Sequence, residues 1–206
     1  FLEGCHALLL IRRAKAHAKQ ALIPLNRSIQ THLGAAVDGT LCKGYGRQWQ
    51  HEHDRLGEYE YLKGVSMMKI ASLIQYTLPG VPSLYYGDEA GMQGLRDPFN
   101  RECMNWDKPN EELHRWYKRL GEIRMGCKVF AHGEFVPVYS NHKTIAYLRS
   151  DEDSEVLVAV NLDDTDVDIF VGEQWDNSYN FFDAKAENGY IHLEPTRYTM
   201  LTRVKQ

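Results

Sequence analysis

The sequence has little of what disulfide-stabilised or zinc-stabilised proteins use. It contains four cysteines, and none of them shows the C-x-x-C spacing of a zinc site. We therefore predict neither a disulfide framework nor a zinc site, and we expect free thiols in a reducing compartment. The four residues are Cys5, Cys42, Cys103 and Cys127.

Long apolar runs and a strong charge of one sign are also missing. No segment approaches the length that spans a bilayer, and residues 1–20 show no small-residue cleavage site after their apolar stretch. We therefore expect a cytoplasmic protein with no membrane partner. The formal net charge is −4, and the basic residues of positions 1–50 are spread thinly. This pattern favours a solvated helix over a nucleic-acid partner.

Two helices are predicted in the middle of the chain. From Tyr59 to Tyr76 apolar residues recur at three- and four-residue steps, which indicates a helix buried on most sides. A second helix is predicted after Asn110, which has the side chain of a good N-cap, and it ends at Gly126. Residues 7–21 favour a helix by composition, whereas residues 22–56 show no sustained period, so the segment 1–57 as a whole is poorly defined by the sequence.

The most informative segment is 78–107. Its apolar part, residues 81–86, is bounded by Pro79-Gly80 and Gly87, which predicts a short, fully buried strand. A buried strand followed at once by polar groups is expected at the active face of a (β/α) barrel. Composition alone allows a core strand followed by a solvated loop equally well. The polar residues are Asp88, Glu89, Arg96, Asp97, Asn100 and Arg101.

Short strands dominate the sequence after Lys128. Several alternate apolar and polar residues, which predicts a small antiparallel sandwich and a domain boundary near 127–131. The predicted domains are therefore 1–57, 58–127 and 128–206. The expected strands are 144–149, 155–162, 167–171, 179–182, 190–193 and 198–204.

The stretch LPGVPSLYYGDEAGMQG, followed by DPFNR and MNWD, resembles the last barrel strand and the loop after it in the α-amylase family of glycoside hydrolases. The resemblance is to the cyclomaltodextrinase, neopullulanase and oligo-glucosidase branch, and it is strong over about residues 58–130. It implies an α/β then all-β fold: the C-terminal portion of a (β/α)8 TIM barrel followed by a small antiparallel β-sandwich.

The resemblance also implies roles for individual residues. Asp88 and Glu89 are similar to the structural carboxylates under the family's catalytic cleft. Asp97 and Arg101, in D-P-x-x-R, are similar to residues that hydrogen-bond a glucose ring of the substrate. A carboxylate that only accepts and a guanidinium with five donors suit vicinal sugar hydroxyls. A local salt bridge between these two residues is the alternative interpretation.

The reacting carboxyl pair of the family has no counterpart in the chain. Retaining glycosidases need a nucleophile and an acid about 5 Å apart, and we find neither motif in residues 1–57, so the chain is expected to begin after the fifth barrel strand. The family's His-Asp pair has two candidates: His53-Asp54, or Thr31-His32 with Leu33 in place of Asp. A non-native origin of the N-terminal segment, by truncation or a frame shift, is a further hypothesis.

The resemblance implies that the full protein hydrolyses α-glucosidic bonds with retention of configuration. Its expected substrate is a maltooligosaccharide or a cyclodextrin-like ring. This chain by itself is expected to be an inactive fragment. We expect no cofactor, and calcium, which the full-length family can bind, has no support in these residues. A non-catalytic, amylase-like scaffold protein is the alternative, although the intact DPFNR favours sugar binding. A third hypothesis makes the tail, residues 128–206, a carbohydrate-binding module whose aromatic residues stack on sugar rings. Aromatic residues in short strands are more often part of a core, so the core interpretation is favoured. The aromatic residues of this hypothesis are Trp175, Tyr179, Phe181 and Phe182.

Overall fold

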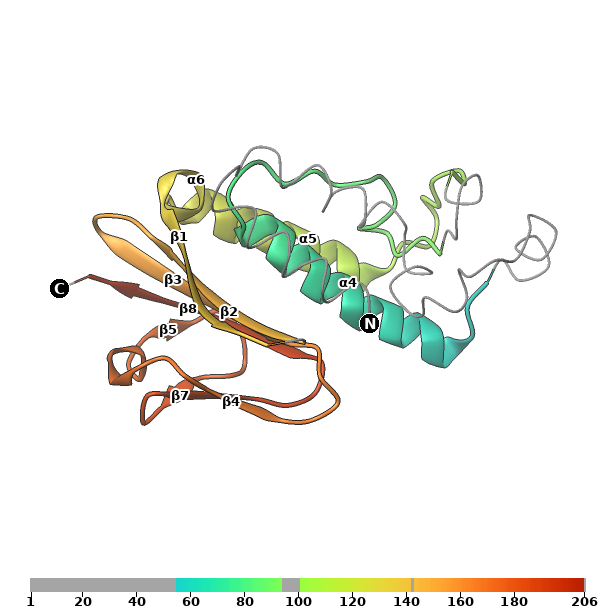
Figure 1. The fold of residues 1–206 in the computed structure, drawn as a ribbon. Helices are drawn as coiled ribbons and strands as arrows, with labels where there is room; N and C mark the ends of the chain where they lie inside the picture. Colours follow the sequence, from blue (N-terminus) through green and yellow to red (C-terminus); the bar gives the residue numbers. More distant parts are fainter. Residues whose placement is uncertain (1–54, 94–100, 142, 206) are drawn as a thin grey trace. The chain divides into compact units, whose positions relative to one another are not determined.

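The structure is a computed structural model that describes residues 55–93, 101–141 and 143–205 (Figure 1). The chain divides into two compact units. Of the described residues, the first unit contains 77–81, 124–141 and 143–205, and the second contains 55–76, 82–93 and 101–123. The domain boundaries that the sequence predicts after residues 57 and 127 are not tested by this division into units, and they stay predictions.

The helix α4, Glu58–Thr77, is the long helix that the apolar period predicts. Val65, Met68 and Leu73 are almost completely buried. Ser72 is buried with them, and its hydroxyl donates to the Met68 carbonyl at 2.7 Å and accepts the Trp116 indole N–H at 2.9 Å. Because both of its hydrogen-bonding functions are satisfied, the hydroxyl costs little in this apolar environment.

The helix α5, Glu111–Gly126, begins where the sequence predicts. The Asn110 side-chain oxygen accepts the Leu113 N–H at 2.9 Å and so caps the first turn. Acidic residues occupy the first turn and Arg124 the last, which complements the helix dipole. Its buried residues form one stripe, as predicted: Leu113, Trp116, Tyr117, Leu120 and Ile123.

The segment 81–86 differs from the buried strand that its composition predicts. Residues 81–85 have irregular backbone, and residues 86–91 form turns. Val81 is 82% exposed, and Leu84 and Tyr86 are each 41% exposed. A parallel strand is buried only when neighbouring strands and covering helices flank it, and no strand in the described part of the chain pairs with this segment. Its membership of a barrel stays a prediction.

The first unit contains two antiparallel sheets that face each other (Figure 1). The five-stranded sheet has the order β1-β2-β3-β8-β5, and the three-stranded sheet has the order β4-β7-β6. The predicted β-sandwich is therefore confirmed. The strands are β1 Glu134–Ser140, β2 Thr144–Ser150, β3 Ser154–Asn161, β4 Val167–Phe170, β5 Tyr179–Asn180, β6 Ala186–Glu187, β7 Tyr190–Leu193 and β8 Arg197–Val204. Two short helices accompany them, α6 Val129–His132 and η1 Glu173–Trp175.

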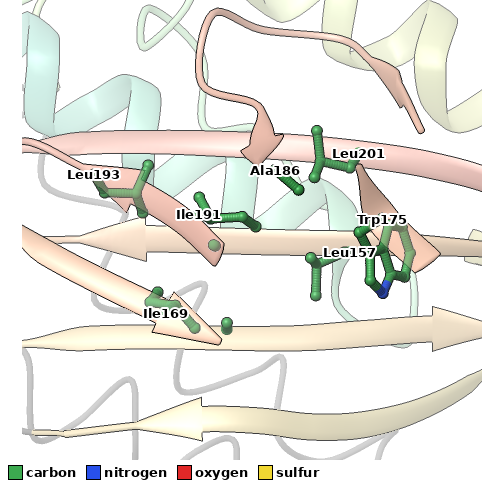
Figure 2. Close-up of a cluster of buried hydrophobic side chains, with 9 residues drawn as sticks. Leu157, Ile169, Trp175, Ala186, Ile191, Leu193 and Leu201 are labelled. Carbon is green, nitrogen blue, oxygen red and sulfur yellow. The ribbon is translucent and has the colours of Figure 1, made fainter. Parts of the chain in front are cut away.

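The core of the sandwich lies between the two sheets (Figure 2). Side chains alternate along each strand, so the residues of one parity face inward and meet those of the opposite sheet. Trp175 of η1 closes one side of this core and is 2% exposed. The buried cluster consists of Ala146, Leu157, Ala159, Ile169, Trp175, Ala186, Ile191, Leu193 and Leu201.

A buried asparagine joins the two sheets by hydrogen bonds. Asn161 lies at the end of β3, and its amide nitrogen donates to the Leu193 and Glu194 carbonyls at 3.1 and 3.0 Å. Its amide oxygen accepts the Thr144 hydroxyl at 3.0 Å. Because the side chain is satisfied on both ends, it fixes the register of the sheets as well as filling the core.

A buried arginine lies on the other face of the five-stranded sheet. Arg149 of β2 is 1% exposed, and its guanidinium donates to four backbone carbonyls. Burial lowers the pKa of Arg149 to about 10, so the group is still a cation at neutral pH. The acceptors, with their distances to the guanidinium nitrogens, are Thr77 O at 2.8 Å, Val129 O at 3.1 Å, Phe130 O at 3.2 Å and Gly133 O at 2.8 Å.

Candidate functional site

The polar turn after residue 86 is shaped by two glycines. Gly87 and Gly91 have φ of +89° and +70°, in the region that side chains other than glycine rarely adopt. A Cβ on Gly87 would lie 2.2 Å from the sulfur of Met92, and one on Gly91 would lie 2.7 Å from the Cβ of Asn110. The turn is therefore compact because these two positions have no side chain.

Asn110 connects this turn to both long helices. Its backbone N–H donates to the Ala90 carbonyl at 2.8 Å, and its amide nitrogen donates to the Tyr61 hydroxyl of α4 at 2.7 Å. The same side chain caps α5 through Leu113. The position of the turn 87–91 therefore depends on one asparagine that bonds to α4, α5 and the turn itself.

The two carboxylates of the turn differ in exposure. Asp88 is 1% exposed, whereas Glu89 is half-buried and accepts the Gly87 N–H at 3.0 Å. Burial, and next the negative charge of Asp88, raise the pKa of Tyr117 in α5 far above its ordinary value. Both carboxylates face protein groups, an arrangement that suits support of the turn. Their place under a catalytic cleft stays a prediction.

Residues 101–107 present polar and aromatic groups to solvent. The Tyr86 hydroxyl donates to the Glu102 carbonyl at 2.9 Å, and Arg55 forms a salt bridge with the Glu102 carboxylate at 3.5 Å. Burial and the neighbouring Tyr85 raise the pKa of Tyr86, while the positive charge of Arg101 acts in the opposite direction. Arg101 is exposed and close enough to Tyr86 to influence its ionisation. A guanidinium in this position can donate to hydroxyl groups of a ligand.

Several predicted site residues lie outside the described part of the chain. These are Asp97, the pair His53-Asp54, and the alternative Thr31-His32 with Leu33. Of the residues that precede and follow Asp97 in the sequence, the structure describes the turn 87–91 and Arg101. Among the described residues, no three His, Cys, Asp or Glu side chains lie together in a way that could hold a metal ion.

The aromatic residues of the tail fall into two classes. Trp175 belongs to the sandwich core and is unavailable for stacking on a ligand. Tyr179 is 60% exposed and packs edge-to-face on Phe181, with ring centroids 5.1 Å apart. A second exposed pair, Phe170 and Tyr190, was not predicted from the sequence. The sequence signal that could have revealed this pair is the alternation of side chains in VDIF (167–170) and YIHL (190–193). Because Ile169 and Ile191 face the core, the neighbouring Phe170 and Tyr190 face solvent.

Curated proteins that act on α-glucans are similar to part of the chain. A cyclomaltodextrinase of Thermoanaerobacter pseudethanolicus is 35% identical over 135 residues, which are 64% of this chain and 24% of that protein. An amylopullulanase of Thermoanaerobacter thermohydrosulfuricus is 36% identical over 85 residues, which are 41% of this chain and 6% of that protein. The chain matches a C-terminal part of α-amylase family glycoside hydrolases.

A solved structure agrees with this assignment. The structure of a cyclomaltodextrinase is 27% identical and superposes with a TM-score of 0.59, covering 70% of this chain and 27% of that one. No family model matches the chain. The chain therefore spans about a quarter of the length of these two cyclomaltodextrinases. Within the described residues, no helix has both the length and the apolar content needed to cross a membrane.

Proposed function

We propose that this chain is the C-terminal part of a glycoside hydrolase that cleaves α-glucosidic bonds in starch-derived oligosaccharides. The observation that supports the proposal most strongly is the DPFNR segment within a match of 35% identity to a cyclomaltodextrinase. The names of the relatives indicate the substrate class, a maltooligosaccharide or a cyclodextrin-like ring. We propose the same substrate class for the protein to which this chain belongs.

Asp97 and Arg101 are the proposed substrate-binding residues. Arg101 is exposed in the segment 101–107, and its five N–H donors suit the paired hydroxyls of a glucose ring. A carboxylate at Asp97 accepts hydroxyl hydrogen bonds that the guanidinium cannot accept. Hydrogen bonds that involve a charged group are stronger than neutral ones, so two such residues fix the orientation of a sugar.

The architecture of the proposal follows the family. Residues 58–127 are proposed to be the last part of a TIM barrel, in which residues 81–86, which are not a strand in this structure, take the position of the eighth strand. Residues 128–206 are proposed to be the C-terminal sandwich domain. Asp88 and Glu89 are proposed to be structural carboxylates that stabilise the turn 87–91. His53 and Asp54 are the proposed seventh-strand pair, which hydrogen-bonds the substrate and stabilises the transition state.

Hydrolysis is proposed to proceed with retention of configuration. One carboxyl group attacks the anomeric carbon and a second protonates the leaving oxygen. We assign neither group to the 206 residues, so the chain by itself is expected to be inactive. Incubation of the purified chain with maltoheptaose should release no shorter sugars, and clear turnover would contradict this part of the proposal.

A chimeric enzyme tests the activity itself. In the Thermoanaerobacter pseudethanolicus cyclomaltodextrinase, the 135 matched residues are replaced by those of this chain. We expect the chimera to hydrolyse β-cyclodextrin. The cyclomaltodextrinase would supply the reacting carboxyl pair, and this chain would supply the proposed substrate-binding residues Asp97 and Arg101. A chimera that is folded by circular dichroism yet shows no hydrolysis would argue for the scaffold alternative.

A further inference from the structure

The outer face of the three-stranded sheet has a square of four exposed side chains. Phe170 of β4 lies opposite Tyr190 of β7, and Asp168 lies opposite His192 in the same register. Between these two pairs, Ile169 lies opposite Ile191 and points into the core. Because side chains alternate along a strand, the aromatic pair and the Asp-His pair must share the solvent face.

The two aromatic rings are exposed and held in place. Phe170 is 63% exposed and Tyr190 is 49% exposed. Their centroids are 5.1 Å apart, and their planes are inclined by 57°. A Cβ on Gly189 would lie 3.1 Å from the Phe170 ring, so the ring rests on a backbone without a side chain. The Asp176 carboxylate accepts the Gly189 N–H at 2.8 Å and fixes this turn.

The polar pair beside the rings is also ordered. The His192 Nδ1 atom lies 2.8 Å from the Asp168 carboxylate, and its Nε2 atom lies 3.9 Å from the carboxylate of Asp166. Glu187 lies opposite Tyr190 on the other side of β7. The rings are therefore flanked by carboxylate acceptors and one imidazole.

We propose that this face binds an α-linked glucan chain, with Phe170 and Tyr190 stacking on sugar rings and Asp168 and His192 bonding to hydroxyl groups. A sugar ring presents an apolar C–H face to an aromatic ring and hydroxyl groups at its edge, which matches apolar rings beside polar acceptors. The surplus of carboxylates disfavours nucleic acids and anionic membranes, and it suits a neutral ligand with many hydroxyl donors.

The inclination of the rings selects the linkage. An α-1,4-glucan curves, so successive sugar rings face different directions, whereas a β-1,4-glucan is a flat ribbon that needs coplanar aromatic rings. Two rings inclined by 57° fit the curved chain. This binding site uses none of the residues proposed for hydrolysis, and it rests on the proposed function only in sharing the α-glucan ligand.

Calorimetric titration of the full 206-residue chain with maltoheptaose and with cellohexaose tests the inference. We expect maltoheptaose to bind with a dissociation constant below about 1 mM, and cellohexaose to bind at least about tenfold more weakly. Phe170→Ala and Tyr190→Ala should each weaken maltoheptaose binding about tenfold. Tyr59→Ala is the control, because Tyr59 is an exposed tyrosine of α4 that lies outside the sandwich and has no proposed role in binding, and it should leave binding unchanged.

Phe170→Leu separates ligand binding from sheet stability. Leucine keeps an apolar cross-strand contact with Tyr190 but has no flat face, so the variant should fold normally and still lose binding. The inference is overturned if maltoheptaose does not bind, if binding survives Phe170→Leu and Tyr190→Ala, or if cellohexaose binds equally well. None of these results alters the β-cyclodextrin hydrolysis expected of the chimera, so the two proposals fail separately.

Discussion

Replacing Arg149 by methionine should destabilise the sandwich unit strongly. The guanidinium is buried and donates to the carbonyls of Thr77, Val129, Phe130 and Gly133. Three of these four acceptors share one nitrogen, which has two hydrogens, so about three bonds form at one time. Methionine has a similar length and packs well, but it donates nothing.

The expected loss follows from the acceptors that are left behind. Each buried carbonyl without a donor costs about 1–3 kcal/mol. Methionine also removes the cost of burying a cation, which offsets part of the loss. We therefore expect the free energy of unfolding to fall by about 3 kcal/mol. Arg149→Lys keeps the charge but lacks the planar fork that reaches separated carbonyls, and it should lose about half as much.

Urea denaturation of the full chain, followed by circular dichroism, measures this effect. With a slope of about 2 kcal/mol/M, the midpoint should fall by about 1.5 M for Arg149→Met. Arg115→Met, at an exposed position of α5, is the matched control and should shift the midpoint little. If Arg149→Met were as stable as the unmodified chain, the hydrogen bonds would not outweigh the desolvation of the cation, and the reasoning would be refuted.

Three further predictions concern the core, the α5 cap and a surface histidine. Trp175→Ala removes a side chain that is 2% exposed and should lower the free energy of unfolding by about 3–5 kcal/mol in the same urea titration; a loss below about 1 kcal/mol would contradict the packing described. Asn110→Ala removes the cap of α5 and should cost about 1 kcal/mol in a thermal melt, whereas Asn110→Asp, which can still cap, should cost less. The hydrogen bond to Asp168 raises the pKa of His192 above 6.5, so its stabilisation is present below pH 6.5 and is lost as the pH rises through the folded-state pKa. An NMR titration should show this raised pKa, and Asp168→Asn should return it toward 6.5; an unchanged value would exclude Asp168 as the cause.

The sequence predicted those helices and strands whose formation depends on residues close together in the chain. The apolar period of α4 and the cap at Asn110 are properties of short segments, and both helices form where the sequence indicates. The strands β2, β3 and β8 were predicted because their apolar residues are dense. In contrast, β1 was missed, since it contains Pro137, a residue that disfavours a strand except at an edge. It is an edge strand, with a register irregularity beside Pro137.

Features that depend on distant residues could not be predicted. The burial of residues 81–86 depends on strands that would flank them, so an apolar composition alone gave the wrong environment. The square on the outer face of β4 and β7 depends on the register of two strands, and nothing in the sequence fixes which residue of β7 lies opposite Phe170. The polar turn was located from its residues, but its connection to α4 and α5 through Asn110 was not foreseen.

The kinetics of the cyclomaltodextrinase chimera test the central claim, that this chain supplies substrate-binding residues of an α-glucan hydrolase, most directly. The measurement compares kcat/KM for β-cyclodextrin between Arg101→Met and Arg115→Met, two substitutions of exposed arginines. Loss of a charge-assisted hydrogen bond of about 1.5–3 kcal/mol predicts a fall of about 10- to 150-fold for Arg101→Met and little change for Arg115→Met. Equal kcat/KM values in the two variants would contradict the account.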